Sequence, residues 1–238
     1  GREVSLTAAG RDFSRYAEQL LDLAAEAREV VTGVDEPSGL FKLSAPESLC
    51  SYRLPGVLDR FVGEHPQVQV LILQEHDMAA LEGRIETGDI DLVFQIAARC
   101  TAVSLIVEEL VAEEVVLVAK PGHPLATKRA MKTAQLQEQT IIFTDSDPTP
   151  CYGTIFRQIL REEGVFPSNY LEFHSIEAIK KCTMSGVGIS LLPRMAVAKE
   201  LEREELVVLP WRDRRLRIST QMIWHKDKWI SPAMRAFM

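Results

Sequence analysis

The sequence predicts an α/β protein that begins with a long helix and continues with two successive series of strands and helices. Three observations indicate this fold class. Residues 7–33 carry one uninterrupted helical pattern, and short apolar segments then alternate with segments of helical period. A stretch with two prolines and a glycine at residues 120–125 divides the alternation in two. Strands separated by helices favour a mainly parallel sheet with helices on both faces.

Composition and charge limit the class of protein. The 238 residues are 46% hydrophobic and 26% charged, as in soluble globular proteins. No apolar run approaches the length of a membrane span and no signal-peptide pattern is present, so we expect a cytoplasmic protein without membrane contact. The net charge of −7 offers no basic stripe for DNA, so any DNA-binding part must lie elsewhere.

Residues 7–33 are predicted to form a long amphipathic helix, with Thr7 as N-cap and Gly33 as its end. Its apolar positions alternate spacings of four and three, the seam of a helix that packs on another helix: Phe13, Ala17, Leu20, Ala24, Ala27 and Val31. A core helix of the following domain is the alternative. The linker-like residues 34–39 favour an independent helix.

The first series lies before residue 120. Apolar or alternating segments predict strands at residues 40–45, 68–74, 90–96, 105–110 and 115–119. Helical spacing predicts helices at residues 46–61, with a kink or break at Pro55, and at residues 78–87. This order of strands and helices is typical of an α/β domain.

The second series follows the break at residues 120–125. The expected strands are residues 140–143, 170–173, 188–192 and 206–209, with a further extended segment at 216–224. The expected helices are residues 152–163, 176–185 and 193–202, with another from Ser231 onward. The two series therefore share an architecture, although no sequence repeat relates them.

Five short elements together resemble the LysR-type transcriptional regulators. Residues 4–10 resemble the end of that family's winged helix-turn-helix and the start of its linker helix. Residues 44–66 resemble the first strand and helix of its effector domain. The other three elements are residues 81–92, 121–125 (Pro-Gly-His-Pro-Leu) and 186–193 (Gly-Val-Gly-Ile-Ser-Leu-Leu-Pro). The resemblance rests on their order and spacing over nearly the whole chain.

The resemblance implies a fold and a domain organisation. Two Rossmann-like subdomains would be joined by crossover strands, as in periplasmic binding proteins. Residues 1–34 would hold the end of the winged helix-turn-helix and the dimerisation helix. Residues 39–119 with 225–238 would form the first subdomain, and residues 120–215 the second. The N-terminal DNA-binding head would be missing, so we expect a piece of a longer protein.

The resemblance also implies a function without catalysis. A small-molecule effector would bind in the cleft between the subdomains and shift them. The shift would change the packing of a homodimer or homotetramer, and with it the spacing of the DNA-binding heads. Such coupling requires that the effector binds one arrangement better than another. RNA polymerase would be a further partner of the full-length protein.

The ligand-binding candidates follow from a rule for open α/β sheets, in which ligands lie at the carboxyl ends of strands and next to helix N-termini. In the first series the rule selects Ser44, Glu47 and Ser48, which lie between a strand and its helix, and Gln95, which follows Phe94 in a later strand. Each has a simpler alternative. Ser48 would only cap its helix, and Gln95 would be a polar loop residue.

In the second series the most informative segment is residues 144–154. Thr144 and Asp145 follow a strand, and Cys151 and Thr154 stand at the N-terminus of the next helix. That position favours a thiolate, so Cys151 is also a candidate for redox sensing. The alternative is a partly buried thiol that lines the pocket.

His174 and Ser175 complete the candidate set. In the LysR-type regulators, residues at this turn often contact the ligand, and the alternative is a hydrogen-bonded structural turn. Glu47, Asp145 and Asp147 make the predicted cleft less cationic than a site for dicarboxylates needs. The charges therefore favour a neutral or zwitterionic effector.

Two other classes of protein share the implied fold. A solute-binding protein of transport would need a signal peptide or lipid anchor and would not need the long N-terminal helix. A dehydratase-like enzyme would need an acid in the cleft, for which Glu47 and Asp145 are the candidates. The sequence has no nucleophile–base motif, cofactor motif or paired metal-ligand spacing. We therefore expect no enzyme activity, no cofactor and no bound metal.

Overall fold

The computed structural model of the chain describes residues 36–73, 78–99, 103–144 and 151–238, and scattered positions between residues 7 and 31. Three residues named above, Gly33, Asp145 and Asp147, lie outside the described residues.

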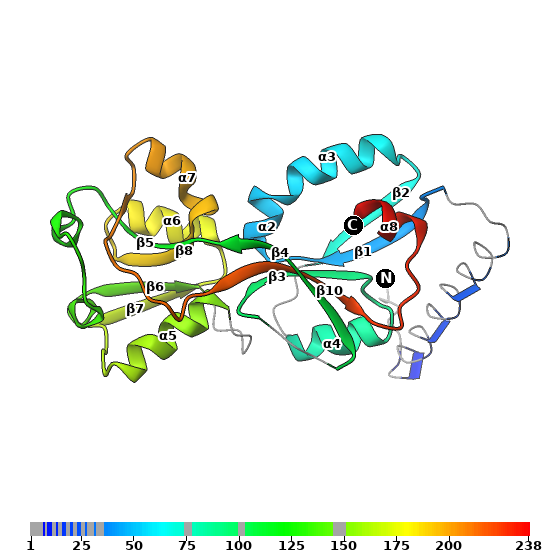
Figure 1. Ribbon diagram of the computed structural model, residues 1–238, viewed down its shortest axis with the longest axis horizontal. Helices are drawn as coiled ribbons and strands as arrows, with labels where there is room; N and C mark the ends of the chain where they lie inside the picture. Colours follow the sequence, from blue (N-terminus) through cyan, green and yellow to red (C-terminus); the bar gives the residue numbers. More distant parts are fainter. Residues whose placement is uncertain are drawn as a thin grey trace, which may run out of the picture.

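Two separate five-stranded sheets form the body of the protein (Figure 1). We call them sheet A and sheet B. Sheet A has the order β2 (Val68–Leu73), β1 (Gly39–Ser44), β3 (Leu92–Ala97), β10 (Ile218–His225) and β4 (Leu105–Glu113). Sheet B has the order β7 (Asn169–Phe173), β6 (Thr140–Thr144), β8 (Ile189–Pro193), β5 (Val115–Ala119) and β9 (Val207–Val208). The predicted α/β fold with two halves is confirmed.

The sheets are mixed, so the prediction of a mainly parallel sheet was wrong. In sheet A, β1 is parallel to β2 and β3, whereas β10 is antiparallel to β3 and β4. In sheet B, β6 is parallel to β7 and β8, whereas β5 is antiparallel to β8 and β9. The antiparallel strands flank the two crossings of the chain: β4 runs through Glu114 into β5, and the chain returns after β9 into β10. Strand periodicity does not encode direction, which explains the error.

The position of β5 also differs from the expected boundary at residue 120. The sequence assigned residues 115–119 to the first subdomain, but β5 pairs with β8 and β9 in sheet B. The first crossing therefore lies at Glu114, one strand earlier in the chain. A buried apolar strand carries no signal of which sheet it joins, because it is apolar on both faces in either case.

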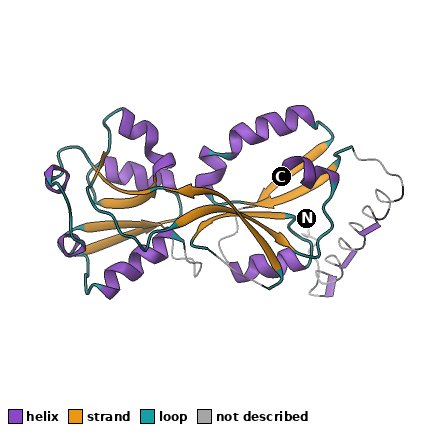
Figure 2. Cartoon of the chain, viewed as in Figure 1, coloured by secondary structure: helices purple, strands orange, loops and turns teal. Residues whose placement is uncertain are grey.

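Helices cover both faces of each sheet (Figures 1 and 2). On sheet A, α2 (Glu47–Tyr52), α3 (Leu54–Glu64) and α8 (Pro232–Phe237) lie on one side and α4 (Met78–Glu86) on the other. On sheet B, α6 (Ile176–Met184) and α7 (Arg194–Glu202) lie opposite α5 (Tyr152–Glu162). The expected helix over residues 46–61 is broken at Arg53, and Pro55 lies in the first turn of α3, where its missing N–H costs nothing.

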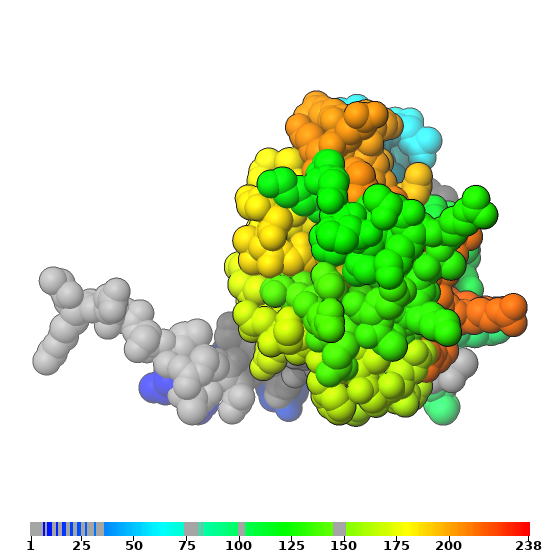
Figure 3. Space-filling view, turned by 90° about the vertical axis from the view of Figure 1, so that its left-hand side faces the viewer, coloured from blue at the N-terminus to red at the C-terminus, as the bar shows by residue number. Residues whose placement is uncertain are grey.

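The apolar core is continuous between the two halves. One cluster of buried side chains includes Phe41 and Phe61 of the sheet A half and Phe156 and Trp211 of the sheet B half. Two smaller clusters lie beneath α4 and beneath α6 with α7. At the far end of the sheet B half, the surface is formed by the connection from β5 to β6, between α5 and α7 (Figure 3). Helices η1 (Pro124–Thr127) and η2 (Thr133–Leu136) belong to this connection.

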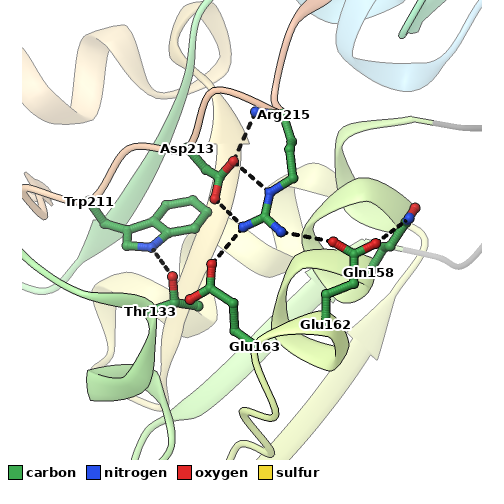
Figure 4. Close-up of polar contacts among 7 residues, drawn as sticks. All are labelled: Thr133, Gln158, Glu162, Glu163, Trp211, Asp213 and Arg215. Atoms are coloured by element: carbon green, nitrogen blue, oxygen red, sulfur yellow. Dashed lines mark hydrogen bonds and ion pairs between the residues drawn. The ribbon is translucent and has the colours of Figure 1, made fainter.

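The second crossing of the chain is attached to α5 by Arg215 (Figure 4). Its guanidinium donates to Asp213 at 2.5 Å, to Glu162 at 2.8 Å and to Glu163 at 2.6 Å. Trp211, in the same segment, donates from its indole N–H to Thr133 at 3.2 Å. The return segment between β9 and β10 is therefore tied to the C-terminal end of α5 and to the connection that contains η2.

The described positions between residues 9 and 31 are helical, and they lie apart from the sheets (Figure 1). Thr7 accepts a hydrogen bond from the Gly10 N–H at 3.0 Å, as an N-cap does. Phe13 is 74% exposed and Leu20 67% exposed, which excludes the alternative of a core helix for these positions. The apolar seam is free to pack on another helix. None of the helices in the described parts of the chain is both long and apolar enough to cross a membrane.

The glycines of the 186–193 element each have a structural reason. Gly186 follows α6 with a φ of +83°, the left-handed conformation that ends a helix. A Cβ on Gly188 would lie 2.6 Å from the backbone oxygen of Thr140. Only glycine allows the chain to pass β6 this closely before it enters β8.

Gly188→Ala should therefore destabilise the protein by about 1–3 kcal/mol, because the backbone of β6 must move. Gly56→Ala is the matched control: Gly56 lies in α3, and its added Cβ would meet nothing within 4 Å. That variant should be neutral or more stable by about 0.5–1 kcal/mol. Urea unfolding of both variants measures the difference, and equal midpoints would contradict the close approach.

Candidate functional site

The carboxyl ends of β1 and β6 lead to the polar side chains that the sequence selected. Ser44 ends β1 and Ser48 lies in the first turn of α2, and both are buried, at 2% and 4% exposure. Thr144 ends β6 and is half-buried. Backbone pairing between Ala97, at the end of β3, and Cys151, before α5, brings the ends of the two sheets together. The candidate residues therefore come from both halves, and this pairing lies at the boundary between them.

Glu47 spans this boundary and binds the N-terminus of α6. Its Oε2 accepts a hydrogen bond from the backbone N–H of Ile176 at 2.7 Å, and its Oε1 accepts one from the hydroxyl of Ser175 at 3.3 Å. The Ser175 Oγ also accepts from the N–H of Ala178 at 3.4 Å, which makes it the N-cap of α6. Two of the predicted residues, Glu47 and Ser175, are thus in direct contact across 128 positions of sequence.

A second set of contacts between the halves lies beside Glu47, and the sequence analysis missed it. Tyr52 of α2 donates from its hydroxyl to Glu177. The ammonium of Lys180 donates to the Tyr52 hydroxyl at 2.9 Å, to Glu177 at 2.9 Å and to Glu200 of α7 at 2.7 Å. The side chain of Lys180 is only 4% exposed. A lysine and a tyrosine 128 positions apart carry no local pattern that would have found this cluster.

The contacts of this cluster fix its protonation states. Burial alone lowers the pKa of Lys180, but the hydrogen bonds to Glu200, Tyr52 and Glu177 outweigh it and raise the pKa. Burial, together with the hydrogen bond to Glu177, raises the pKa of the Tyr52 phenol. The hydrogen bond from Tyr52 lowers the pKa of Glu177. At neutral pH the cluster therefore holds a charged lysine, a neutral tyrosine and ionised Glu177.

Gln95 is buried and held by a second glutamine, Gln221 of β10. Gln221 donates from Nε2 to the backbone oxygens of Ala97 at 3.2 Å and Ala98 at 3.1 Å, which fixes its amide orientation. Its Oε1 therefore faces Gln95 and accepts from Gln95 Nε2 at 2.8 Å. Gln95 Oε1 is then left buried, without a hydrogen-bond donor among the described residues. Gln221 was missed, because it is one of several polar residues in the segment 216–224 and nothing local distinguishes it.

Cys151 and Thr154 stand at the start of α5 as predicted. Cys151 is the residue before the first turn, and Thr154 donates to its backbone oxygen at 2.9 Å. A Cβ on Gly153 would lie 2.5 Å from Thr144 Oγ1, so this glycine allows the end of β6 to approach the helix. Cys151 carries a free, half-buried thiol. Burial raises the pKa of the neighbouring Tyr152 phenol, which stays neutral.

His174 lies on the loop between β7 and α6 and is exposed. Its backbone neighbour Ser175 reaches Glu47. The described residues contain no group of three or more His, Cys, Asp or Glu side chains arranged to hold a metal ion.

A cavity of about 860 Å³ lies on another part of the surface, next to the two crossings of the chain. Its walls include Glu113 and Glu114, Met131, Arg194 and Trp211. None of the predicted ligand-binding residues lines it. Its carboxylates already have partners within the protein, since Glu113 pairs with Arg53 at 2.7 Å and Glu114 with Arg194 at 3.5 Å.

Comparison with known proteins identifies relatives along the whole chain. The family model of the LysR substrate binding domain matches residues 35–238. An HTH-type transcriptional regulator of Bacillus subtilis, YwqM, is 34% identical over 238 residues, which cover 100% of this chain and 80% of the relative. The HTH-type regulator YfiE of Escherichia coli is 31% identical over 239 residues, which cover 100% of this chain and 79% of the relative.

Solved structures share the fold at lower identity. The regulatory domain of CcmR from Synechocystis, in complex with 2-PG, has a TM-score of 0.72 at 21% identity, with 84% of this chain and 94% of that chain covered. The effector binding domain of QuiR, in complex with shikimate, has a TM-score of 0.67 at 18% identity, with the same coverage.

Lys180→Met should lower the free energy of unfolding by about 3 kcal/mol, because the largely buried carboxylate of Glu200 loses its ion pair with Lys180. Lys181→Met, at the exposed next position, is the control and should change stability by less than about 0.5 kcal/mol. A raised lysine pKa gives stability that is present below the ordinary value of about 10.4 and is lost only above it. The penalty, measured by urea unfolding, should therefore be constant from about pH 7 to about pH 9. A loss of stability that disappears between these pH values would contradict a Lys180 that stays charged because its pKa is raised.

Proposed function

The chain belongs to the LysR family of transcriptional regulators, with its effector-binding domain at residues 35–238, and on this premise we propose that a small polar effector binds between the two halves, at the carboxyl ends of β1 and β6. The binding residues are those the sequence selected: Ser44, Glu47, Ser48, Gln95, Thr144, Asp145, Cys151, Thr154, His174 and Ser175. The observation that carries the proposal is the buried Oε1 of Gln95, which has no hydrogen-bond donor in the part of the chain that the structure describes.

An unpaired buried oxygen is costly, about 1–3 kcal/mol, unless a ligand or ordered water supplies the donor. Gln95 lies in β3 two residues before Ala97, whose backbone pairs with Cys151 of the other half. Buried polar groups between two subdomains can orient a ligand. If the boundary only held the two halves together, apolar side chains would do so better. The related domains that bind 2-PG and shikimate support a small polar molecule, because they share this fold.

Effector binding is proposed to act by shifting the two halves relative to each other. The halves meet through two backbone crossings and through the contacts of α2 with α6, and the second of these includes Glu47 and Ser175 of the proposed site. An effector that fits one spacing of the halves better than another will change the population of that spacing. The proposed result is a changed packing of oligomers and a changed hold on DNA, rather than chemical turnover.

The partners follow from the same proposal. The relatives named above are HTH-type regulators, which supports a DNA-binding head N-terminal to these residues. The exposed seam of Phe13, Leu20 and Val31 supports a homodimer or homotetramer that pairs through this helix. RNA polymerase as a partner of the full-length protein, a cytoplasmic location and redox sensing by Cys151 remain predictions.

A thermal-shift screen of small neutral, zwitterionic and acidic metabolites tests the site. A ligand at about a hundred times its dissociation constant should add about 2.7 kcal/mol of stability. Ser48→Ala should remove most of this gain, because the hydroxyl is buried at the proposed site. Ser51→Ala, exposed on the same helix, is the control and should keep it. A ligand that binds both variants as it binds the parent protein would place the effector elsewhere.

Charged substitutions in the apolar seam of the N-terminal helix test whether this helix mediates oligomerisation. Leu20→Asp combined with Val31→Asp should shift the protein toward monomers, because a carboxylate is costly to bury between two helices. Val103→Asp, at a position 93% exposed and outside the seam, should leave the assembly unchanged. Light scattering during size exclusion measures the mass, and an unchanged dimer or tetramer in the double variant would refute the proposal.

A further inference from the structure

The first turn of α6 is a place where proteins often bind anions. The N–H groups at a helix N-terminus have no partner within the helix, and the helix dipole favours negative charge there. Here the position is taken by the protein itself. The carboxylate of Glu47 accepts from the Ile176 N–H at 2.7 Å and from the Ser175 hydroxyl at 3.3 Å.

The contact with Glu47 crosses between the two halves of the protein, unlike the cap that the helix receives from its own segment. Ser175 already caps α6 through the Ala178 N–H, so the helix has a cap from its own segment. Glu47 comes from the other half of the protein, and it is the first residue of α2. Its side chain thus places a negative charge at the contact between the two halves.

We propose that Glu47 determines specificity: it keeps acidic groups away from the N-terminus of α6 and selects an effector that presents a hydrogen-bond donor there, such as an ammonium, amide or hydroxyl group. This inference rests on the proposed function, because it concerns the same site. It narrows the effector from a small polar molecule to one whose group near Glu47 carries no negative charge.

The acceptors around the site support the selection of donors. Gln95 Oε1 is a buried acceptor without a donor among the described residues. Gln221 is fixed by its own hydrogen bonds and accepts from Gln95 Nε2, so the side-chain amide of Gln95 cannot flip to present a donor instead. The Glu47 oxygens are acceptors as well, with lone pairs beyond those used by α6. A molecule that donates hydrogen bonds satisfies these groups, whereas a carboxylate adds further acceptors.

The neighbouring charges do not compensate a second anion. Lys180 is the buried cation beside Glu47 in the described part of the site, and it already donates to two carboxylates, Glu177 and Glu200. An acidic group at α6 would therefore meet Glu47 without a free cation in this cluster. Displacing Glu47 would also leave that carboxylate without its two donors.

Sulfate is a direct probe of this exclusion, and it does not require the effector to be known. Calorimetric titration with sodium sulfate, at ionic strength held constant with chloride, should show no site in the parent protein. Glu47→Ala should gain a sulfate site at α6, with an affinity at least tenfold higher than that of the parent. Glu64→Ala, which removes a carboxylate from the exposed end of α3, should behave as the parent does.

Glu47→Gln keeps an acceptor for the Ile176 N–H and removes only the charge, so it carries the test if the alanine variant folds poorly. It too should bind sulfate more tightly than the parent. Equal sulfate binding by the parent and both variants would overturn the proposal, as would a crystal of Glu47→Ala in which sulfate does not lie at α6. These outcomes are independent of the Ser48 test, so a failure of one does not imply a failure of the other.

Discussion

The hydrogen bonds from α6 to Glu47 are the interaction on which the arrangement of the two halves depends. The chain crosses between the sheets twice, and one apolar cluster extends into both halves. Glu47 and its neighbour in the same helix, Tyr52, add contacts on one side of the boundary, and each reaches a residue of α6 or the turn before it. A hydrogen bond to a charged group contributes about 2 kcal/mol. Its loss would change the ratio of two arrangements roughly thirtyfold.

A contact of this strength is suitable for regulation. It is strong enough to favour one spacing of the halves and weak enough for a ligand of ordinary affinity to overcome. The helices beside the boundary also extend away from it. The N-terminal end of α5 carries Cys151 at the boundary, and its C-terminal end is tied by Arg215 to the returning crossing (Figure 4). A ligand that moves α5 would therefore move that crossing as well.

Much of the fold could be predicted from the sequence, because periodicity and helix-breaking residues are local signals. Ser44 and Thr144 could be placed at strand ends, since apolar runs stop there. Strand direction could not be predicted, because the side-chain patterns of β10 and β4 would be the same whichever way these strands run. The Tyr52–Lys180 contact and the Gln95–Gln221 pair join positions more than a hundred residues apart, so only folding brings them together. The charge of Glu47 was noted, but its partner in α6 was not foreseen.

Hydrogen exchange at the amide of Ile176 tests the central contact most directly. This N–H is the first of α6 and has no acceptor within the helix, so any hydrogen-bond protection must come from Glu47. We predict slow exchange in the parent protein and in Glu47→Gln, and at least tenfold faster exchange in Glu47→Ala, with the amides in the middle of α6 unchanged. Exchange at Ile176 that is equally fast in all three proteins would show that Glu47 does not hold the two halves together.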